Sequence, residues 1–172
     1  MGIFRNYTGN PIFDTFASKY TEAITLRCNI LKKIQINIIT IDNYLKNKGN
    51  LPYIKEIEKQ AMSYYITKGD KTINKTDTKA GIIINSSLIS NLGLSDEEQM
   101  ACFAHEIGHF AFFFLENKNA YIEEIYADEY AKLIGLEEPL CSALRKLIDS
   151  NLYSEELTRD INFRIRWLEI KI

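Results

Sequence analysis

"FAHEIGHFAFFFLEN", residues 103–117, holds both histidines of the 172-residue chain, His105 and His109, with Glu106 directly after the first. Upstream, Ser95 and Glu98 form a capping-box pattern, in which a hydroxyl and a carboxylate satisfy free backbone N–H groups at the start of a helix. We therefore predict one helix that begins at Ser95 and ends near residues 117–119. Two histidines and the carboxylate of Glu106 are unusual in such an apolar helix, which indicates that they have a specific function.

The histidine spacing predicts a metal site. Residues four apart on an α-helix lie about 40° apart around the axis and one turn along it, so His105 and His109 can reach a single ion. Glu106 lies three positions before His109 and borders the same face. This is the H-E-x-x-H arrangement, in which two neutral imidazoles bind Zn²⁺ and the glutamate acts on the water of the metal. The alternative is a pair of ordinary core or surface histidines.

A catalytic zinc ion needs a third protein ligand and an open position for water. The chain has no third histidine, and the segment "YIEEIYADEYA" (121–131) offers four carboxylates: Glu123, Glu124, Asp128 and Glu129. Glu124 and Asp128 share a helix face with Ala127 and Ala131, whose small side chains would let two helices approach closely. We expect Glu124 to bind the metal and Asp128 to hold a histidine in its metal-binding tautomer.

Other residues near the motif have less defined roles. Glu123 would share a bulkier face with two tyrosines, which suits packing or solvent contact, and Glu123→Ala is expected to change zinc binding little. Cys102 could supply a thiolate ligand or a redox switch, although a free cysteine on an apolar helix is usually a small core residue. The group that would stabilise an oxyanion stays open among several candidates: Tyr126, Tyr130, Tyr153 and an arginine.

The N-terminal part has a helical pattern. From Phe13 to Leu45, apolar residues recur at alternating steps of four and three, with Arg27 as the one polar member. This heptad spacing predicts a long helix, or two helices end to end, that packs on its own domain or forms a coiled coil with a partner. The stretch "IQINIIT" (34–40) is rich in β-branched residues, so a strand there is the alternative.

The remaining elements follow from breaks and caps. We expect a helix begun by Pro52 with Tyr65 on its apolar face, a loop or hairpin at 67–80, and a strand at 81–85. Helices are predicted at about 120–134, stopped by Gly135, at 139–150 and at 154–168. The sequence thus predicts a predominantly helical α+β protein, with a helical segment at 1–50 and a second domain at 51–172.

The composition and charge of the chain indicate which partners and which cellular location to expect. The net charge is −2, which gives no reason to expect nucleic acid or an acidic membrane as a partner. The apolar run Phe110–Leu115 is far shorter than the roughly 20 residues that span a bilayer. Three cysteines without a secretion signal suggest reduced thiols. We expect a cytoplasmic protein.

Three segments resemble a known group of enzymes. "GIIINSSLISNLGLSDEEQMACFAHEIGHF" (81–110) resembles the strand, capped helix and H-E-x-x-H block of gluzincin zinc metallopeptidases. The nearest likeness is to the CaaX prenyl protease and membrane heat-shock peptidase family and its small soluble relatives, the minigluzincins. "EIYAD" (124–128) is similar to the E-x-x-x-D segment of that family, and "RIRWL" (164–168) looks like its late helix. Together these segments cover about residues 80–168.

The resemblance implies a small sheet packed on a metal helix and a glutamate-ligand helix. It implies that His105, His109 and Glu124 bind Zn²⁺, and that Glu106 acts as general base and then as acid. By the same resemblance, Asp128 and Arg164 would support the site. The expected activity is that of a zinc-dependent endopeptidase acting on a peptide or protein. The chain departs from the family in lacking a transmembrane segment and a recognisable edge strand within "KTINKTDTKA" (71–80).

Other readings stay open. The chain is also similar to ImmA/IrrE-type repressor-cleaving peptidases, whose likeness would make a DNA-bound repressor the substrate. A non-proteolytic zinc scaffold could instead bind a partner through the N-terminal helical segment, and a homodimer or a self-inhibiting terminal segment is compatible with the extra helices. Glu106 favours a peptidase, because a structural zinc site needs no base.

Overall fold

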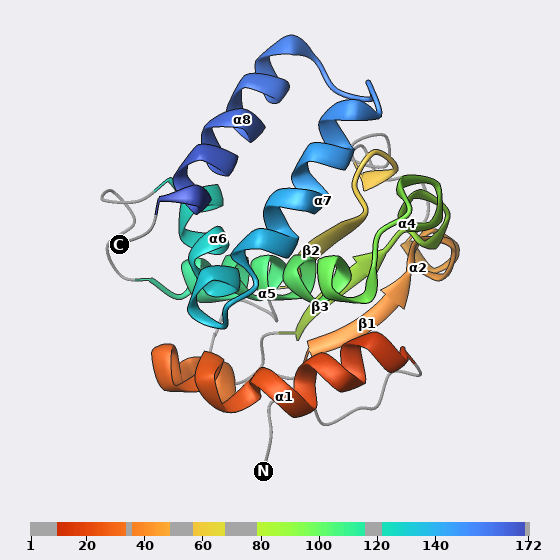
Figure 1. The fold of residues 1–172 in the computed structure, drawn as a ribbon. Helices are drawn as coiled ribbons and strands as arrows, with labels where there is room; N and C mark the ends of the chain where they lie inside the picture. Colours follow the sequence, from red (N-terminus) through yellow and green to blue (C-terminus); the bar gives the residue numbers. More distant parts are fainter. Residues whose placement is uncertain (1–9, 34–35, 49–56, 68–78, 116–121, 171–172) are drawn as a thin grey trace. The chain divides into compact units, whose positions relative to one another are not determined.

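The computed structural model describes residues 10–33, 36–48, 57–67, 79–115 and 122–170 (Figure 1). Its contacts group the chain into two compact units, Met1–Ile89 and Ser90–Ile172, and the division falls within helix α4 (Ser86–Leu92). The first unit contains a three-stranded sheet and the second contains helices α5 to α8. The predicted predominantly helical α+β class is confirmed.

The N-terminal helix is shorter than its heptad spacing predicted. Helix α1 (Pro11–Arg27) begins with proline at its first position, and the Asn10 side chain accepts a hydrogen bond from the backbone N–H of Phe13. A 3₁₀ turn, η1 (Asn29–Lys33), follows, and the chain then forms strand β1 (Ile36–Thr40) and helix α2 (Ile41–Lys48). The prediction of a continuous helix is therefore wrong at residues 36–40, and the alternative prediction of a strand there is confirmed.

The sheet explains why β1 is a strand. Its order is β1-β3-β2, with β3 (Lys79–Ile84) in the centre, parallel to β1 and antiparallel to β2 (Met62–Thr67). A strand was predicted at 81–85, and β3 overlaps this range. Its consecutive isoleucines are buried, as is usual for a central strand whose two faces are both buried. Because β1, before residue 50, pairs with β3, after it, the first compact unit extends past the predicted boundary at residue 50.

Two further predictions concern the segment between β1 and β3. The helix expected from Pro52 to Tyr65 is wrong from Met62 onward, since those residues form β2. Residues 51–56 lie outside the described part of the chain, as do residues 68–78 of the expected loop or hairpin. The flanking strands β2 and β3 are antiparallel neighbours, with Thr67 opposite Lys79.

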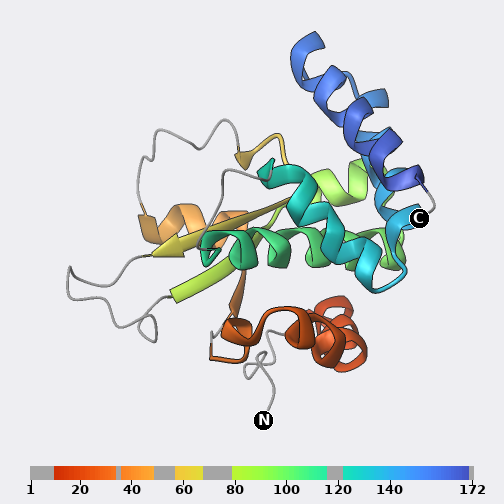
Figure 2. The ribbon, with the colours of Figure 1, turned by 90° about the vertical axis from the view of Figure 1, so that its left-hand side faces the viewer.

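The second unit follows the predicted helices closely. It consists of α5 (Asp96–Phe113), α6 (Glu123–Leu133), α7 (Glu137–Asp149) and α8 (Glu155–Glu169), and α6 runs beside α5 in both views (Figure 2). The capping box at Ser95 is present, and the Ser154 side chain caps α8. Gly135 follows α6 with a φ of 74°, a left-handed conformation that glycine adopts without strain. α5 ends at Phe113, and residues 116–121 are not described.

A buried carboxylate fixes the start of α5 against α7. Glu98 accepts hydrogen bonds from the Ser95 backbone N–H at 2.6 Å, the Ser142 hydroxyl at 2.6 Å and the Lys146 ammonium at 2.7 Å. Burial alone would raise the pKa of Glu98, but these donors outweigh burial and lower it. No helix in the described segments is both long enough and apolar enough to cross a bilayer.

Candidate metal centre

Helices α5 and α6 approach so closely that only glycine fits at one position. A Cβ atom on Gly108 would lie 2.5 Å from the Cα atom of Ala127 and 2.6 Å from its carbonyl oxygen. Ala127 and Ala131 are fully buried, as expected for small residues at a close helix contact. Gly108 is not among the residues predicted above, although a glycine inside an apolar helix can indicate such a close contact.

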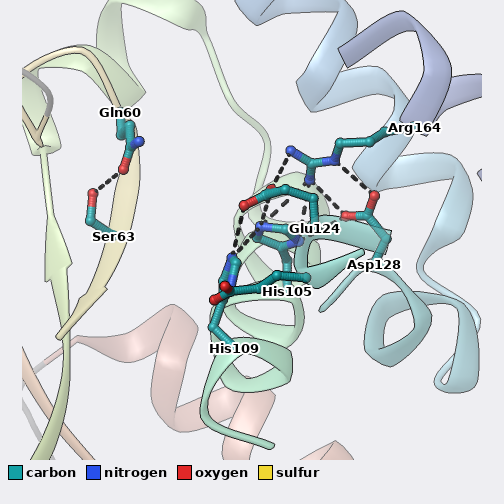
Figure 3. A network of polar contacts seen from close by, with 8 residues as sticks. Gln60, Ser63, His105, His109, Glu124, Asp128 and Arg164 are labelled. Atoms are coloured by element: carbon teal, nitrogen blue, oxygen red, sulfur yellow. Dashed lines mark hydrogen bonds and ion pairs between the residues drawn. The ribbon is translucent and has the colours of Figure 1, made fainter. Parts of the chain in front are cut away.

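The contact brings the three predicted ligands together. His105 and His109 project from α5 toward Glu124 on α6 (Figure 3). Their Nε2 atoms lie 3.1 Å apart, and each lies 3.5 Å from one oxygen of the Glu124 carboxylate. One potential ligand atom from each residue lies within 4.8 Å of the others, which makes this a group able to hold a metal ion.

The opposite side of each imidazole contacts a carboxylate. His105 Nδ1 lies 2.7 Å from Asp128 Oδ1, and His109 Nδ1 lies 2.8 Å from Glu123 Oε1. An ionised carboxylate only accepts hydrogen bonds, so each Nδ1 carries the proton and donates it. In the neutral imidazoles, both Nε2 atoms are then acceptors that face each other and Glu124. This is the tautomer that metal-binding histidines use.

The residues fit a zinc ion. In a tetrahedral site with bonds of about 2.0–2.1 Å, neighbouring ligand atoms lie roughly 3.3 Å apart. The two Nε2 atoms, 3.1 Å apart, lie near that value, and each is 3.5 Å from a different oxygen of the Glu124 carboxylate, so a small shift of this carboxylate would complete the site. Three acceptor groups pointing at one another repel, and a cation between them would remove the repulsion. Two imidazoles and one carboxylate are also a ligand set that zinc accepts in catalytic sites.

Asp128 and Arg164 form ion pairs and hydrogen bonds with each other and with the predicted ligands His105 and Glu124. The Arg164 guanidinium donates to both oxygens of the fully buried Asp128, at 2.8 Å from Nε and 2.7 Å from Nη2. Burial alone would raise the pKa of Asp128, but Arg164 and His105 hold it at about 2. Burial alone would likewise lower the pKa of Arg164, and the charge of Asp128 raises it instead. Asp128 is thus ionised and positions His105 at neutral pH.

Arg164 also fixes the third ligand. Its Nη1 atom lies 2.8 Å from Glu124 Oε2, so one guanidinium holds both acidic residues of the "EIYAD" segment. Its Nη2 atom is 3.2 Å from His105 Nδ1, a contact that arises because both nitrogens donate to Asp128 Oδ1. Arg164 therefore contacts Asp128, Glu124 and His105, and Asp128 contacts His105 as well.

Glu123 makes a contact that helix periodicity did not predict. Its side chain is 40% exposed, in line with the expected solvent contact, and its carboxylate also accepts a hydrogen bond from His109. Burial alone would lower the pKa of His109, while this hydrogen bond and the charges of Glu106 and Glu124 raise it. The prediction considered only the face of α6 that contains Glu124, and Glu123 lies on a different face. The two imidazoles lie one turn apart on α5, so carboxylates from both faces of α6 can contact them.

Glu106 is a buried residue of α5 that directly follows the predicted ligand His105. The residue is 7% exposed. Burial raises its pKa, the positive charges of protonated His105 and His109 would lower it, and the charge of Glu124 raises it further, for a net increase.

The other candidates are not members of the group that could hold a metal among the described residues. Among the described residues, Cys102 is not a member of the group that could hold a metal. Burial, followed by the charge of Glu106, raises the pKa of the Cys102 thiol to about 12, which leaves no thiolate at neutral pH. The rings of Tyr126 and Tyr130 contact each other at an angle of 54°, with their centroids 5.9 Å apart. Burial raises the pKa of Tyr153, and the charge of Arg164 opposes this increase.

Gly108→Ala is expected to destabilise the protein and to weaken zinc binding. Helix propensity alone predicts the opposite, a gain of about 0.5–1 kcal/mol. The new Cβ atom would meet the Ala127 backbone, so α6 must move and carry Glu124 and Asp128 away from the histidines. Thermal unfolding and zinc titration measure both effects. Ala127→Gly should not rescue the variant, since the contact is with backbone atoms, and a raised melting temperature would contradict the close contact.

No family model matches the chain, and neither a curated protein nor a solved structure matches it. The interpretation of this site therefore depends on the geometry of its own residues.

Proposed function

We propose that the protein is a zinc-dependent peptidase of the gluzincin type. The observation that supports this most is the convergence of the two histidine Nε2 atoms and the Glu124 carboxylate. Glu106, the residue directly after His105, is buried on the same helix. His105, His109 and Glu124 would hold the zinc ion. Three protein ligands leave one position open, as catalytic rather than structural zinc sites do.

The residues around the ligands would have distinct tasks. Zinc, when bound, supplies a Lewis acid that polarises a carbonyl group and lowers the pKa of a coordinated water toward about 7. The Glu106 carboxylate would accept the proton of the attacking water and pass it to the leaving amine. Asp128 would keep the Nδ1 proton of His105 in place, and Arg164 would hold Asp128 and Glu124.

The expected substrate is a peptide or protein, cleaved within the chain. A repressor protein, as the likeness to ImmA/IrrE-type peptidases suggests, belongs to the same class of substrate. A non-proteolytic zinc scaffold is the competing function. Glu106 argues against a scaffold, because a structural zinc site needs no base directly after one of its ligands.

A peptide-library digest tests the proposal. Purified protein would be stripped with a chelator, reloaded with one equivalent of zinc, and incubated with a library of peptides read out by mass spectrometry. We expect internal cleavage by the zinc-loaded protein, loss of cleavage after stripping and recovery on reloading. Fully loaded protein that cleaves no member of a broad library would support the scaffold, and cleavage unaffected by metal removal would contradict the proposed mechanism.

A further inference from the structure

We infer that Glu123 is a positioning residue for His109, holding its imidazole so that Nε2 faces the metal. This inference rests on the proposed zinc site, and it adds a second orienting carboxylate to that site. Neither the resemblance nor the periodicity of α6 assigns Glu123 any role. Glu123 Oε1 accepts a hydrogen bond of 2.8 Å from His109 Nδ1.

The contact determines which nitrogen of His109 can bind metal. The protonated nitrogen of a neutral imidazole is set by the hydrogen bond that this nitrogen makes. With Nδ1 donating to Glu123, the lone pair of His109 is on Nε2, which lies 3.1 Å from His105 Nε2. Glu124 cannot take over this task, because its oxygens lie 3.5 Å from the Nε2 atoms and one of them contacts Arg164.

The two orienting carboxylates differ in their surroundings. Asp128 is fully buried and receives two hydrogen bonds from Arg164. The Glu123 side chain is 40% exposed and lies at the first residue of α6, where the helix dipole favours a negative charge. Water can therefore compete for the Glu123 contact, and its loss should cost less zinc affinity than the loss of Asp128. Orienting partners of metal-binding histidines are typically worth 10–100-fold, so we expect about 10-fold for Glu123.

The first measurement needs neither zinc nor activity. Nitrogen-15 NMR of the imidazole rings, in metal-free protein at a pH where both rings are neutral, reports which nitrogen of His109 is protonated. We expect the Nδ1–H form in the wild type and a shift toward the Nε2–H form in Glu123→Ala. Glu123→Gln keeps an amide oxygen as acceptor and should retain the wild-type tautomer. A wild-type His109 in the Nε2–H form would overturn the inference.

The second measurement is a zinc titration against a chromophoric chelator. We expect Glu123→Ala to weaken zinc binding about 10-fold and Glu123→Gln to weaken it less. Glu129→Ala is the matched control, since Glu129 is on the same helix at similar exposure but six positions on, about 120° around the axis. Circular dichroism would verify that each variant is folded.

The outcomes separate the two claims. Tight zinc binding by the wild type with equal affinity in Glu123→Ala would overturn the role of Glu123 and leave the proposed zinc site intact. A loss in Glu129→Ala as large as that in Glu123→Ala would also overturn it, because the effect would then be unspecific. A wild type that binds no zinc would overturn the proposed function, and the inference with it.

Discussion

Glu106→Gln is expected to lower the rate of peptide hydrolysis by about 10²–10⁴-fold while the zinc content stays near that of the wild type. Glutamine has nearly the same shape as glutamate, but its amide cannot accept the proton of an attacking water. Glu106 is not a member of the ligand group, so the substitution removes no bond to the metal. The loss should appear in kcat, with KM little changed, since the proton transfer belongs to the transition state.

The control for this variant is Glu97→Gln, an identical change at an exposed position of the same helix. It should leave both the rate and the zinc content unchanged. Equal rates for wild type and Glu106→Gln, on a peptide that the wild type cleaves, would show that Glu106 is not the base.

Glu124→Ala is expected to reduce zinc affinity more than any change among the orienting residues, by well over the 10–100-fold that such residues typically contribute. The substitution removes one of three ligands and leaves two imidazoles. It also removes the carboxylate that contacts Arg164, although Arg164 keeps both of its hydrogen bonds to Asp128. The fold should therefore survive, which circular dichroism would verify.

The order of the losses identifies the ligand. In one set of zinc titrations, we expect the largest loss for Glu124→Ala, a loss within 10–100-fold for Asp128→Ala, and a smaller one for Glu123→Ala. A large loss in Glu123→Ala with none in Glu124→Ala would exchange the roles of the two adjacent glutamates. The side chains of adjacent residues on a helix point about 100° apart, so we expect only one of Glu123 and Glu124 to bind the ion.

The local parts of this site could be predicted from the sequence. The capping box at Ser95 and the spacing of His105 and His109 follow from helix periodicity alone, and the structure has both. Glu124 and Asp128 could be selected because they share a face with small residues. Each of these inferences uses side chains less than two turns apart, where the geometry of an α-helix is nearly fixed.

Features that depend on distant partners could not be predicted in the same way. The heptad spacing, which Ile38 continues, predicts a helix at β1, whereas the pairing of β1 with β3 involves residues far along the chain. The role of Glu123 required knowing how α6 lies against two imidazoles one turn apart. The need for glycine at position 108 required the distance between two helix backbones, which no single-helix pattern contains.

X-ray absorption at the zinc edge, on wild-type protein loaded with one equivalent of zinc, tests the central claim most directly. The account predicts one zinc ion per chain, with nitrogen and oxygen neighbours at about 2.0–2.1 Å and imidazole scattering from two histidines. Protein that retains no zinc would contradict the account. So would a sulfur neighbour at about 2.3 Å, since it would place a thiolate in the site instead of Glu124.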